Sequence, residues 1–369
     1  MHDNSTRQEK ARQYQAHKNR LFLISLAVHG AALVLAIASG WTWVFKAGAL
    51  RIHPSLWAVV FFYFFIFSLY FLLWEFPLDV YAGYFLEKRF GLSTQSFSGW
   101  LFEELKKQVL SFLFSAALVE ALYFFLRHFP NIWWLFAWGG WFVVTVLMGK
   151  FAAVLILPLF YKCTRLEDEA LRNRILGLLE KHRFPVKDIY VINLSKTTRK
   201  ANAAFTGLGS TRRVILADTL LENFTHEEIE TVVAHELGHC RKRHLLKGVI
   251  FNTAVSFAVF YAADLALNRW TGPLGFEGPS DIAAFPLLGL VAFAAGLILM
   301  PVGNAYSRFH ETEADDFALQ ECADRGPFIS ALRKLGSQNL ADFDPHPLIE
   351  FFLYSHPSIG KRIRHAENA

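Results

Sequence analysis

The sequence predicts a mainly α-helical, polytopic membrane protein that carries a polar insert with a small β-sheet. Hydrophobic residues make up 53% of the 369 residues and charged residues only 19%, a balance that is typical of membrane proteins. Six apolar runs approach or exceed the roughly 20 residues that an α-helix needs to cross a bilayer. The longest polar stretch between these runs contains short segments rich in β-branched and aromatic residues, which favour strands.

The six predicted spans are separated by polar segments of different lengths. Their bounds are 21–40, 56–73, 109–126, 132–159, 248–268 and 285–306. The first run has an alternative interpretation as a signal peptide, because Ala36-Ile37-Ala38 is a small-x-small pattern. After the second run, Pro77 is predicted to bend the chain into a polar section. Three ionisable residues in or near the spans receive no predicted role: Glu120, Lys150 and Asp264.

Six spans place all the long polar segments on one side of the membrane. These segments hold nearly all the Lys and Arg residues, so the positive-inside rule makes that side cytoplasmic. The net charge of +5 does not indicate nucleic-acid binding, because the basic residues lie in short clusters beside apolar spans. The predicted divisions are a cytoplasmic tail (1–20), N-terminal transmembrane helices (21–160), a polar insert (161–247), a transmembrane hairpin (248–306) and a C-terminal part (307–369).

The polar insert is predicted to combine two helices with a few short strands. Apolar residues at helical spacing predict an amphipathic helix over 166–182. Thr225 and Glu228 form a T-x-x-E capping box, which predicts a helix beginning at about His226. The predicted strands are 189–192, 203–206 and 214–216.

The second helix of the insert contains the pattern H-E-x-x-H at His235-Glu236-Leu237-Gly238-His239. Residues four apart on a helix share one face, so both imidazoles can bind the same Zn²⁺ ion. Glu236 is offset from that face and can reach a metal-bound water without being a ligand. A catalytic zinc ion has three protein ligands and one open position, so a third ligand is expected elsewhere.

Two positions compete for the third ligand. His244 lies five residues after His239, and Lys242 occupies the place where a three-histidine zinc motif needs glycine. We therefore predict that His244 is a polar residue at the membrane face. Glu311, which follows the sixth span, is the better candidate, and Asp315 one turn later could accept a hydrogen bond from a ligating imidazole. A solvated acidic helix is the alternative interpretation of this segment.

Together these motifs resemble the type I CAAX prenyl proteases, a family of integral-membrane zinc metallopeptidases of the gluzincin kind. The resemblance starts from the H-E-x-x-H motif and from Ser307-Arg308 followed by Glu311 and Asp315. It extends to three further segments: Glu87 with Phe90-Gly91-Leu92, Asn202-Ala203-Ala204-Phe205, and His356-Pro357 with Arg362. Family members of the yeast and human type have seven spans, whereas six are predicted here.

The resemblance implies a zincin-like metallopeptidase domain that caps a chamber enclosed by the membrane helices. It implies one Zn²⁺ per chain, bound by His235, His239 and Glu311, with Glu236 as the catalytic base. It also implies that Asn202 and Ala203 bind substrate backbone, that Asp315 supports the zinc ligands, and that His356 and Arg362 face the oxyanion.

The sequence thus predicts a membrane-embedded zinc endopeptidase in which Glu236 takes a proton from a zinc-bound water. Its substrate is a peptide or protein, prenylated at a C-terminal CAAX motif if the resemblance extends to specificity. The first alternative is a broader protease for membrane-protein quality control. The second is a non-catalytic membrane protein with a metal site. The expected location, in contact with lipid, is a bacterial inner membrane or the endoplasmic reticulum, with the catalytic domain on the cytoplasmic side.

Overall fold

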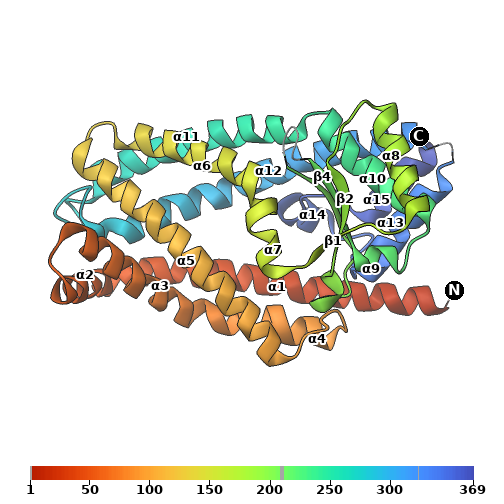
Figure 1. Cartoon of the computed structure of the whole chain (residues 1–369). Coiled ribbons are helices and arrows are strands. Elements are labelled where there is room, and N and C mark those ends of the chain that lie inside the picture. Colours follow the sequence, from red (N-terminus) through yellow and green to blue (C-terminus); the bar gives the residue numbers. More distant parts are fainter. Residues whose placement is uncertain (1, 208–211, 323) are drawn as a thin grey trace.

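The computed structural model describes residues 2–207, 212–322 and 324–369, and it has two parts: a bundle of long helices and a mixed α/β domain at one end (Figure 1). Both termini lie at the end of the molecule that holds the α/β domain. Among the described residues, six helices are long and apolar enough to cross a membrane. The predicted mainly α-helical, polytopic fold with a small sheet is therefore confirmed.

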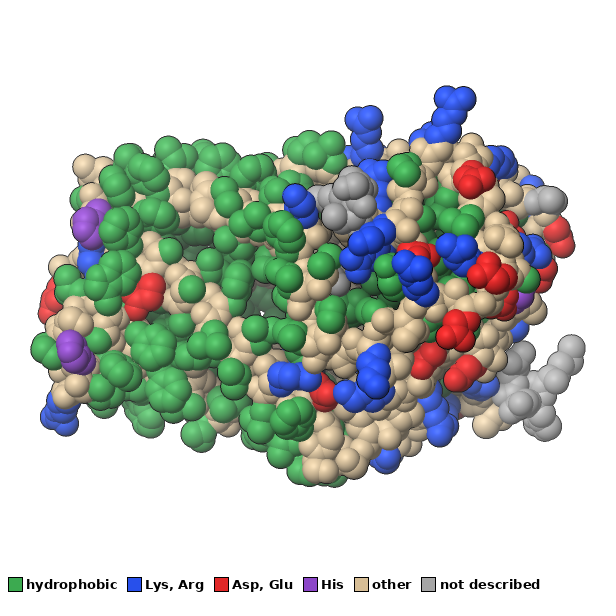
Figure 2. Space-filling model, in the orientation of Figure 1, with side chains coloured by type: hydrophobic (Ala, Val, Ile, Leu, Met, Phe, Trp, Pro, Cys, Tyr) green, Lys and Arg blue, Asp and Glu red, His purple; other side chains and the backbone are tan. Residues whose placement is uncertain are grey.

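Most helices of the bundle are longer than the predicted spans, whereas α6 is shorter. Its long members are α1 (His2–Ala38), α3 (Leu56–Val80), α5 (Phe97–His128), α6 (Trp133–Leu155), α11 (His244–Trp270) and α12 (Phe285–Glu321). The short α2 (Trp41–Ile52) closes the end of the bundle that lies far from the α/β domain (Figure 1). Hydrophobic side chains cover most of the bundle surface, and charged side chains gather over the α/β domain (Figure 2). This division is what a bilayer around the bundle requires.

The α/β domain is built on a four-stranded mixed sheet. The strand order is β1-β2-β4-β3, and only the β2–β4 pair is parallel. The strands are β1 (Cys163–Arg165), β2 (Asp188–Ile192), β3 (Ala203–Thr206) and β4 (Arg213–Ala217). Three of them match the predicted strands. β1 was not predicted, because its three residues are all exposed and leave no alternating hydrophobic pattern.

Helices from both halves of the domain pack on one core. The amphipathic helix α8 (Glu169–Lys181) contributes Ile175, and α10 (His226–Arg241) contributes Val233 and Leu237 to the same core. The C-terminal helices are α13 (Gly326–Gln338), α14 (Pro347–Leu353) and α15 (Ile359–Asn368), and they follow α12 in the chain. Shorter pieces are α7 (Leu157–Phe160) and α9 (Asp218–Leu221).

One local prediction about the helices was wrong. Pro77 does not turn the chain, because α3 continues through a π-helical segment (Tyr81–Leu86) into α4 (Glu87–Arg89). A proline is tolerated inside a membrane helix when π-type adjustments satisfy the freed backbone groups. The polar residues before position 21, predicted as a cytoplasmic tail, are helical and form the first half of α1. Tyr14 in this half is fully buried against the α/β domain side of the bundle.

Two of the unassigned ionisable residues have partners in the described structure. The buried carboxylate of Asp264 accepts a hydrogen bond of 2.6 Å from the indole N–H of Trp133. The ammonium of Lys150 lies 5.1 Å from the centre of the Phe151 ring. Glu120 is partly buried, and its Oε2 has no hydrogen-bond partner among the described residues. None of the three lies on the wall of the cavity described below.

Helices α10 and α12 make a close contact at Gly238. A Cβ atom built on Gly238 would lie 3.1 Å from Cα and O of Ala314 and 3.2 Å from Cβ of Phe317. These distances are shorter than ordinary van der Waals contacts, so any larger residue would push the two helices apart. The separation of α10 and α12 therefore depends on this glycine.

We predict that Gly238→Ala separates α10 from α12, lowers the melting temperature and reduces the metal content of the purified protein. A glycine-to-alanine change inside a helix normally stabilises by about 0.5–1 kcal/mol, whereas overpacking costs about 1–3 kcal/mol. Gly177→Ala on α8 is the matched control, since nothing lies within 4 Å of its added Cβ. Thermal unfolding and metal analysis in detergent measure both effects. Equal behaviour of the two variants would contradict the prediction.

Candidate active site

Helix α10 places His235 and His239 side by side. The predicted capping box is present: the Thr225 hydroxyl accepts from the Glu228 N–H, and the Glu228 carboxylate accepts from the Thr225 N–H. The helix therefore has a defined start and runs without interruption through both histidines. Their Nε2 atoms lie 3.2 Å apart, and their ring planes are nearly perpendicular at 80°.

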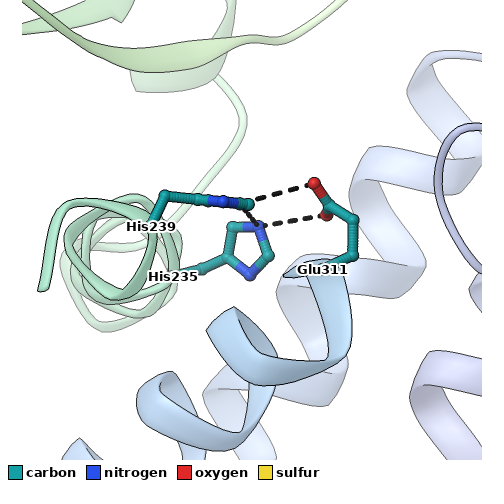
Figure 3. Close-up of side chains that lie close together, drawn as sticks. All are labelled: His235, His239 and Glu311. Carbon is teal, nitrogen blue, oxygen red and sulfur yellow. Dashed lines mark hydrogen bonds and ion pairs between the residues drawn. The ribbon is translucent and has the colours of Figure 1, made fainter. Parts of the chain in front are cut away.

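Helix α12 brings Glu311 to the same point. Its Oε2 lies 3.4 Å from Nε2 of His235, and its Oε1 lies 3.4 Å from Nε2 of His239. Figure 3 shows the three side chains converging from α10 and α12. Glu311 is only 5% exposed. The predicted third ligand therefore lies beside the H-E-x-x-H pair, although Glu311 is 72 positions after His239 and the intervening chain forms α11 and most of α12.

The three groups fit a divalent metal ion. Metal–nitrogen and metal–oxygen bonds of about 2.0–2.1 Å in a tetrahedral site place neighbouring donor atoms about 3.3 Å apart. The observed separations of 3.2 and 3.4 Å match that value. The buried imidazole of His235, the partly buried imidazole of His239 and the buried carboxylate of Glu311 form a donor set for a cation. Two histidines and one glutamate are also a ligand set of catalytic zinc sites.

Asp315 and Arg362 support His235 from the side opposite to the donor cluster. Oδ1 of Asp315 lies 2.8 Å from Nδ1 of His235, so Nδ1–H donates to the carboxylate and Nε2 faces the cluster. Arg362 donates two hydrogen bonds to Asp315, of 2.6 and 2.8 Å. Burial alone lowers the pKa of His235, but its hydrogen bonds to Asp315 and Glu311 raise that pKa to about 9. A bound metal ion would replace a proton at this position.

Glu236 lies next to His235 on the wall of a cavity and has no partner within the described part of the chain. It is half-buried, and it makes no hydrogen bond or ion pair within the described part of the chain. Burial raises the pKa of Glu236, while the neighbouring His235 and His239 oppose that rise. An unpartnered carboxylate with a raised pKa next to a metal site is suited to accept and release a proton near neutral pH.

The cavity beside these residues has a volume of about 590 Å³. Its wall includes His235, Glu236 and Glu311 at one end and the predicted substrate residues Asn202 and Ala203 on another side. Among the described residues, β3 pairs with β4 along one edge only, so its other edge can pair with an extended peptide. Apolar side chains of α13, among them Phe328, Leu332 and Leu335, line another part of the wall, and α1 contributes Gln15, Lys18, Asn19 and Phe22.

His356 and Arg362, the predicted oxyanion residues, both lie on the cavity wall but differ in their surroundings. His356 is exposed, and its Nε2 lies 3.3 Å from Oε1 of Glu311. The Arg362 side chain is 12% exposed, and two of its nitrogens bond Asp315. His356 therefore faces open space beside the ligand cluster, whereas Arg362 is held behind His235.

Arg308 holds the segment that precedes His356. Its guanidinium donates hydrogen bonds of 3.1, 3.3 and 2.7 Å to the carbonyl oxygens of Glu350, Phe351 and Tyr354. These carbonyls end helix α14, where the last carbonyl groups lack partners within the helix. The Ser-Arg signature before Glu311 thus has a structural consequence: it fixes the turn that leads to His356.

The structure corrects the prediction for His244 and reveals three residues that sequence reasoning missed. His244 is not at the membrane face, because it is only 7% exposed and its Nδ1 lies 2.9 Å from Nδ1 of His239. Its Nε2 lies 3.1 Å from Oε2 of Glu313, which also contacts His310 and Lys247. The only signal in the sequence was an unusual density of His and Glu residues in both segments.

Comparisons with known proteins match both parts of the chain. Residues 165–369 match the model of peptidase family M48, and residues 3–162 match a model described as the CAAX prenyl protease N-terminal region with five membrane helices. Within that second range, four of the described helices are long and apolar enough to span a membrane.

Two relatives and one solved structure illustrate the similarity. The chain is 30% identical to the uncharacterised metalloprotease YhfN of Bacillus subtilis, over 97% of this chain and 84% of that protein. It is 31% identical to CAAX prenyl protease 1 of Saccharomyces cerevisiae, over 78% of this chain and 68% of that one. The crystal structure of S. mikatae Ste24p superposes with a TM-score of 0.89 and 25% identity, over 98% of this chain and 89% of that chain.

We predict that Asp315→Asn lowers metal affinity by about 10–100-fold, because loss of an outer carboxylate partner of a ligating histidine typically has that effect. Asp316→Asn on the same helix is the control, since Asp316 is bonded to the exposed His365 and touches no predicted ligand. Competition with a chelator of known affinity measures both variants. The proposed support of His235 is wrong if the two variants retain the metal equally well.

Proposed function

The chain belongs to peptidase family M48, and from this premise we propose that it uses a zinc ion to cut prenylated proteins near their C-termini. It is an integral, multi-pass membrane metalloprotease that acts on a peptide or protein substrate. We propose that the metal is zinc, that one ion binds per chain, and that the ligands are His235, His239 and Glu311.

One observation carries the proposal: the donor groups His235 and Glu311 share the wall of one cavity with the unpartnered Glu236, and the third donor, His239, lies beside them. A purely structural metal site needs no free carboxylate beside it, and its four positions are normally all filled by protein ligands. Among the residues that the structure describes, three donor residues converge here, and a carboxylate with a raised pKa lies next to them. This combination supports hydrolysis.

When bound, zinc acts as a Lewis acid that polarises the scissile carbonyl and lowers the pKa of water. The remaining steps belong to side chains. Glu236 takes a proton from the attacking water and later delivers it to the leaving amine, since it is the one acidic group on the wall that is free to do both. His356 donates to the oxyanion of the tetrahedral intermediate, a type of contact typically worth about 3–4 kcal/mol.

Arg362 takes a different place in this proposal. Arg362 donates two hydrogen bonds to Asp315, and one of its nitrogens lies 3.4 Å from Nδ1 of His235. Its charge therefore faces the carboxylate that holds His235. We assign it as a positioning residue that holds Asp315, and only its remaining N–H groups are left for the oxyanion. Asn202 and Ala203, at the start of the edge strand β3, align the substrate backbone.

The proposal for substrate and location combines the relatives with the charge distribution. Several relatives bear the name CAAX prenyl protease, and the cavity lies in the charged end of the molecule next to the apolar bundle. A substrate anchored to the bilayer by a prenyl group could present its C-terminus there. The excess of Lys and Arg at this end supports a cytoplasmic position of the catalytic domain, in a bacterial inner membrane or the endoplasmic reticulum.

We predict that Glu236→Gln keeps bound zinc but lowers kcat by at least about 10²-fold, because the variant loses its proton acceptor and keeps its ligands. The purified variant and the wild type are compared for zinc content and for peptide cleavage. Full cleavage by the zinc-loaded variant would rule out Glu236 as the base. Cleavage by neither protein would favour the non-catalytic alternative.

We further predict that the wild type releases a tripeptide from a farnesylated C-a-a-X peptide and that a chelator stops this release. The unprenylated peptide of the same sequence is the control for specificity. Equal cleavage of both peptides would instead support the alternative of a broader membrane-protein quality-control protease. Zinc, added after the chelator is removed, should restore activity in either case.

A further inference from the structure

A second buried polar cluster lies directly behind His239. It consists of His244 at the start of α11, His310 and Glu313 on α12, and the ammonium group of Lys247. His244 and His310 are each only 7% exposed. Oε2 of Glu313 lies 3.1 Å from Nε2 of His244, 3.1 Å from Nδ1 of His310 and 3.2 Å from Nζ of Lys247. One carboxylate oxygen therefore gathers three donors.

A break between α10 and α11 turns His244 toward His239. On one continuous helix, residues five apart point about 140° away from each other. Here α10 ends at Arg241 and α11 begins at His244, and Arg243 between them has a left-handed backbone with φ of 56°. This turn brings Nδ1 of His244 to 2.9 Å from Nδ1 of His239. A non-glycine residue in this conformation is uncommon, so the local strain serves a defined contact.

The order of these contacts permits one arrangement of protons when His239 binds a metal through Nε2. Nδ1 of His239 then carries the proton and must donate it, so Nδ1 of His244 must accept. His244 consequently keeps its own proton on Nε2, and it donates that proton to Glu313. The chain of hydrogen bonds runs in one direction, from the ligand His239 through His244 to a carboxylate.

His244, His310 and Glu313 have the composition of a second metal site. Two observations oppose metal binding there. A metal on Nε2 of His244 would move the proton to Nδ1, where it would face the Nδ1–H of the ligand His239. In addition, the ammonium of Lys247 already contacts the Glu313 oxygen that such a metal would need. The geometry therefore favours hydrogen bonding over metal binding.

We propose that His244 and Glu313 form a positioning relay that fixes the tautomer and orientation of His239 and strengthens its hold on zinc. The inference rests on the proposed zinc site. It gives His239 a support equivalent to the one that Asp315 gives His235, with an imidazole inserted between ligand and carboxylate. Lys247 and His310 hold the carboxylate of Glu313 in place.

The first test compares zinc dissociation constants of full-length variants in detergent by competition with a chelator. His244→Leu removes the acceptor of the His239 proton, and we expect zinc affinity to fall by about 10–100-fold. His244→Gln has an amide oxygen and an N–H group spaced like the two imidazole nitrogens, and it should recover most of the affinity. His226→Leu on α10 is the matched control, because His226 pairs only with the exposed Asp168.

The second test uses Glu313→Gln, which leaves His244 in place and keeps the shape of the side chain. A relay predicts weaker zinc binding in this variant, and a double variant His244→Leu/Glu313→Gln that binds no more weakly than His244→Leu alone. It also predicts a changed visible spectrum of the cobalt-substituted variants, because the orientation of the His239 ring changes. A purely structural role would lower the melting temperature and leave the affinity and the spectrum unchanged.

The outcomes separate the relay from the function on which it rests. A wild type that holds zinc and cleaves peptide, with both variants binding zinc as tightly as the wild type, overturns the relay alone. Two zinc ions in the wild type and one in Glu313→Gln overturn it in favour of a second metal site. A wild type that binds no zinc overturns both proposals.

Discussion

The close contact between α10 and α12 is the constraint on which the rest of the site depends. The two helices supply all three proposed ligands. Gly238, between the two histidines, lets the helices approach so closely that a Cβ atom at this position would press against the backbone of α12 at Ala314. A metal ion tolerates errors of only a few tenths of an ångström in ligand position. The packing of small residues at this crossing, Gly238 against Ala314, therefore sets the coordination geometry before any metal binds.

Helix α12 carries more of the site than any other element. Its C-terminal part presents Arg308 to the turn before His356, Glu311 to the donor cluster, and Asp315 to His235. Glu313, on another face of the same helix, reaches the partner of His239. Because the helix continues directly from a membrane span, these groups share one rigid support. In the sequence, Glu311, Glu313 and Asp315 resemble a solvated charged face. In the structure each has a different partner: Glu311 contacts both histidines of the H-E-x-x-H motif, Glu313 contacts His244, and Asp315 contacts His235.

The sequence was sufficient where short-range rules decide the structure. The capping box at Thr225 and the i,i+4 spacing of His235 and His239 depend on neighbours within one helix, and both appear as predicted. His244 was misjudged because its direction depends on the left-handed residue Arg243, and no glycine or proline marks that turn in the sequence.

Longer-range features were missed for a related reason. The bend predicted at Pro77 did not allow for the fact that a membrane helix can continue through a proline. The pairing of Arg362 with Asp315 joins residues 47 positions apart, and spacing alone cannot show it. The family resemblance identified these residues, but their contacts distinguish a group that faces substrate from one that holds a ligand.

The substrate side of the cavity also depends on helices that extend from the membrane. The carboxylate of Glu87, at the end of the α3 extension, accepts hydrogen bonds from Tyr14 of α1 and from Lys200. The side-chain amide of Asn339 accepts a hydrogen bond from the backbone N–H of Ala201 and donates one to the carbonyl oxygen of Ala201. These contacts fix the backbone that enters β3, the strand proposed to align substrate.

The contact of α10 with α12 therefore positions the proposed metal ligands, while the N-terminal helices position the strand proposed to align substrate. The α/β domain alone holds neither the proposed ligands nor the substrate strand in place. A change that loosens the packing of the bundle would shift the substrate strand relative to the ligands, even if every residue on the cavity wall were unchanged. Assembly of the membrane helices is thus a condition for the geometry of the site as well as for its location.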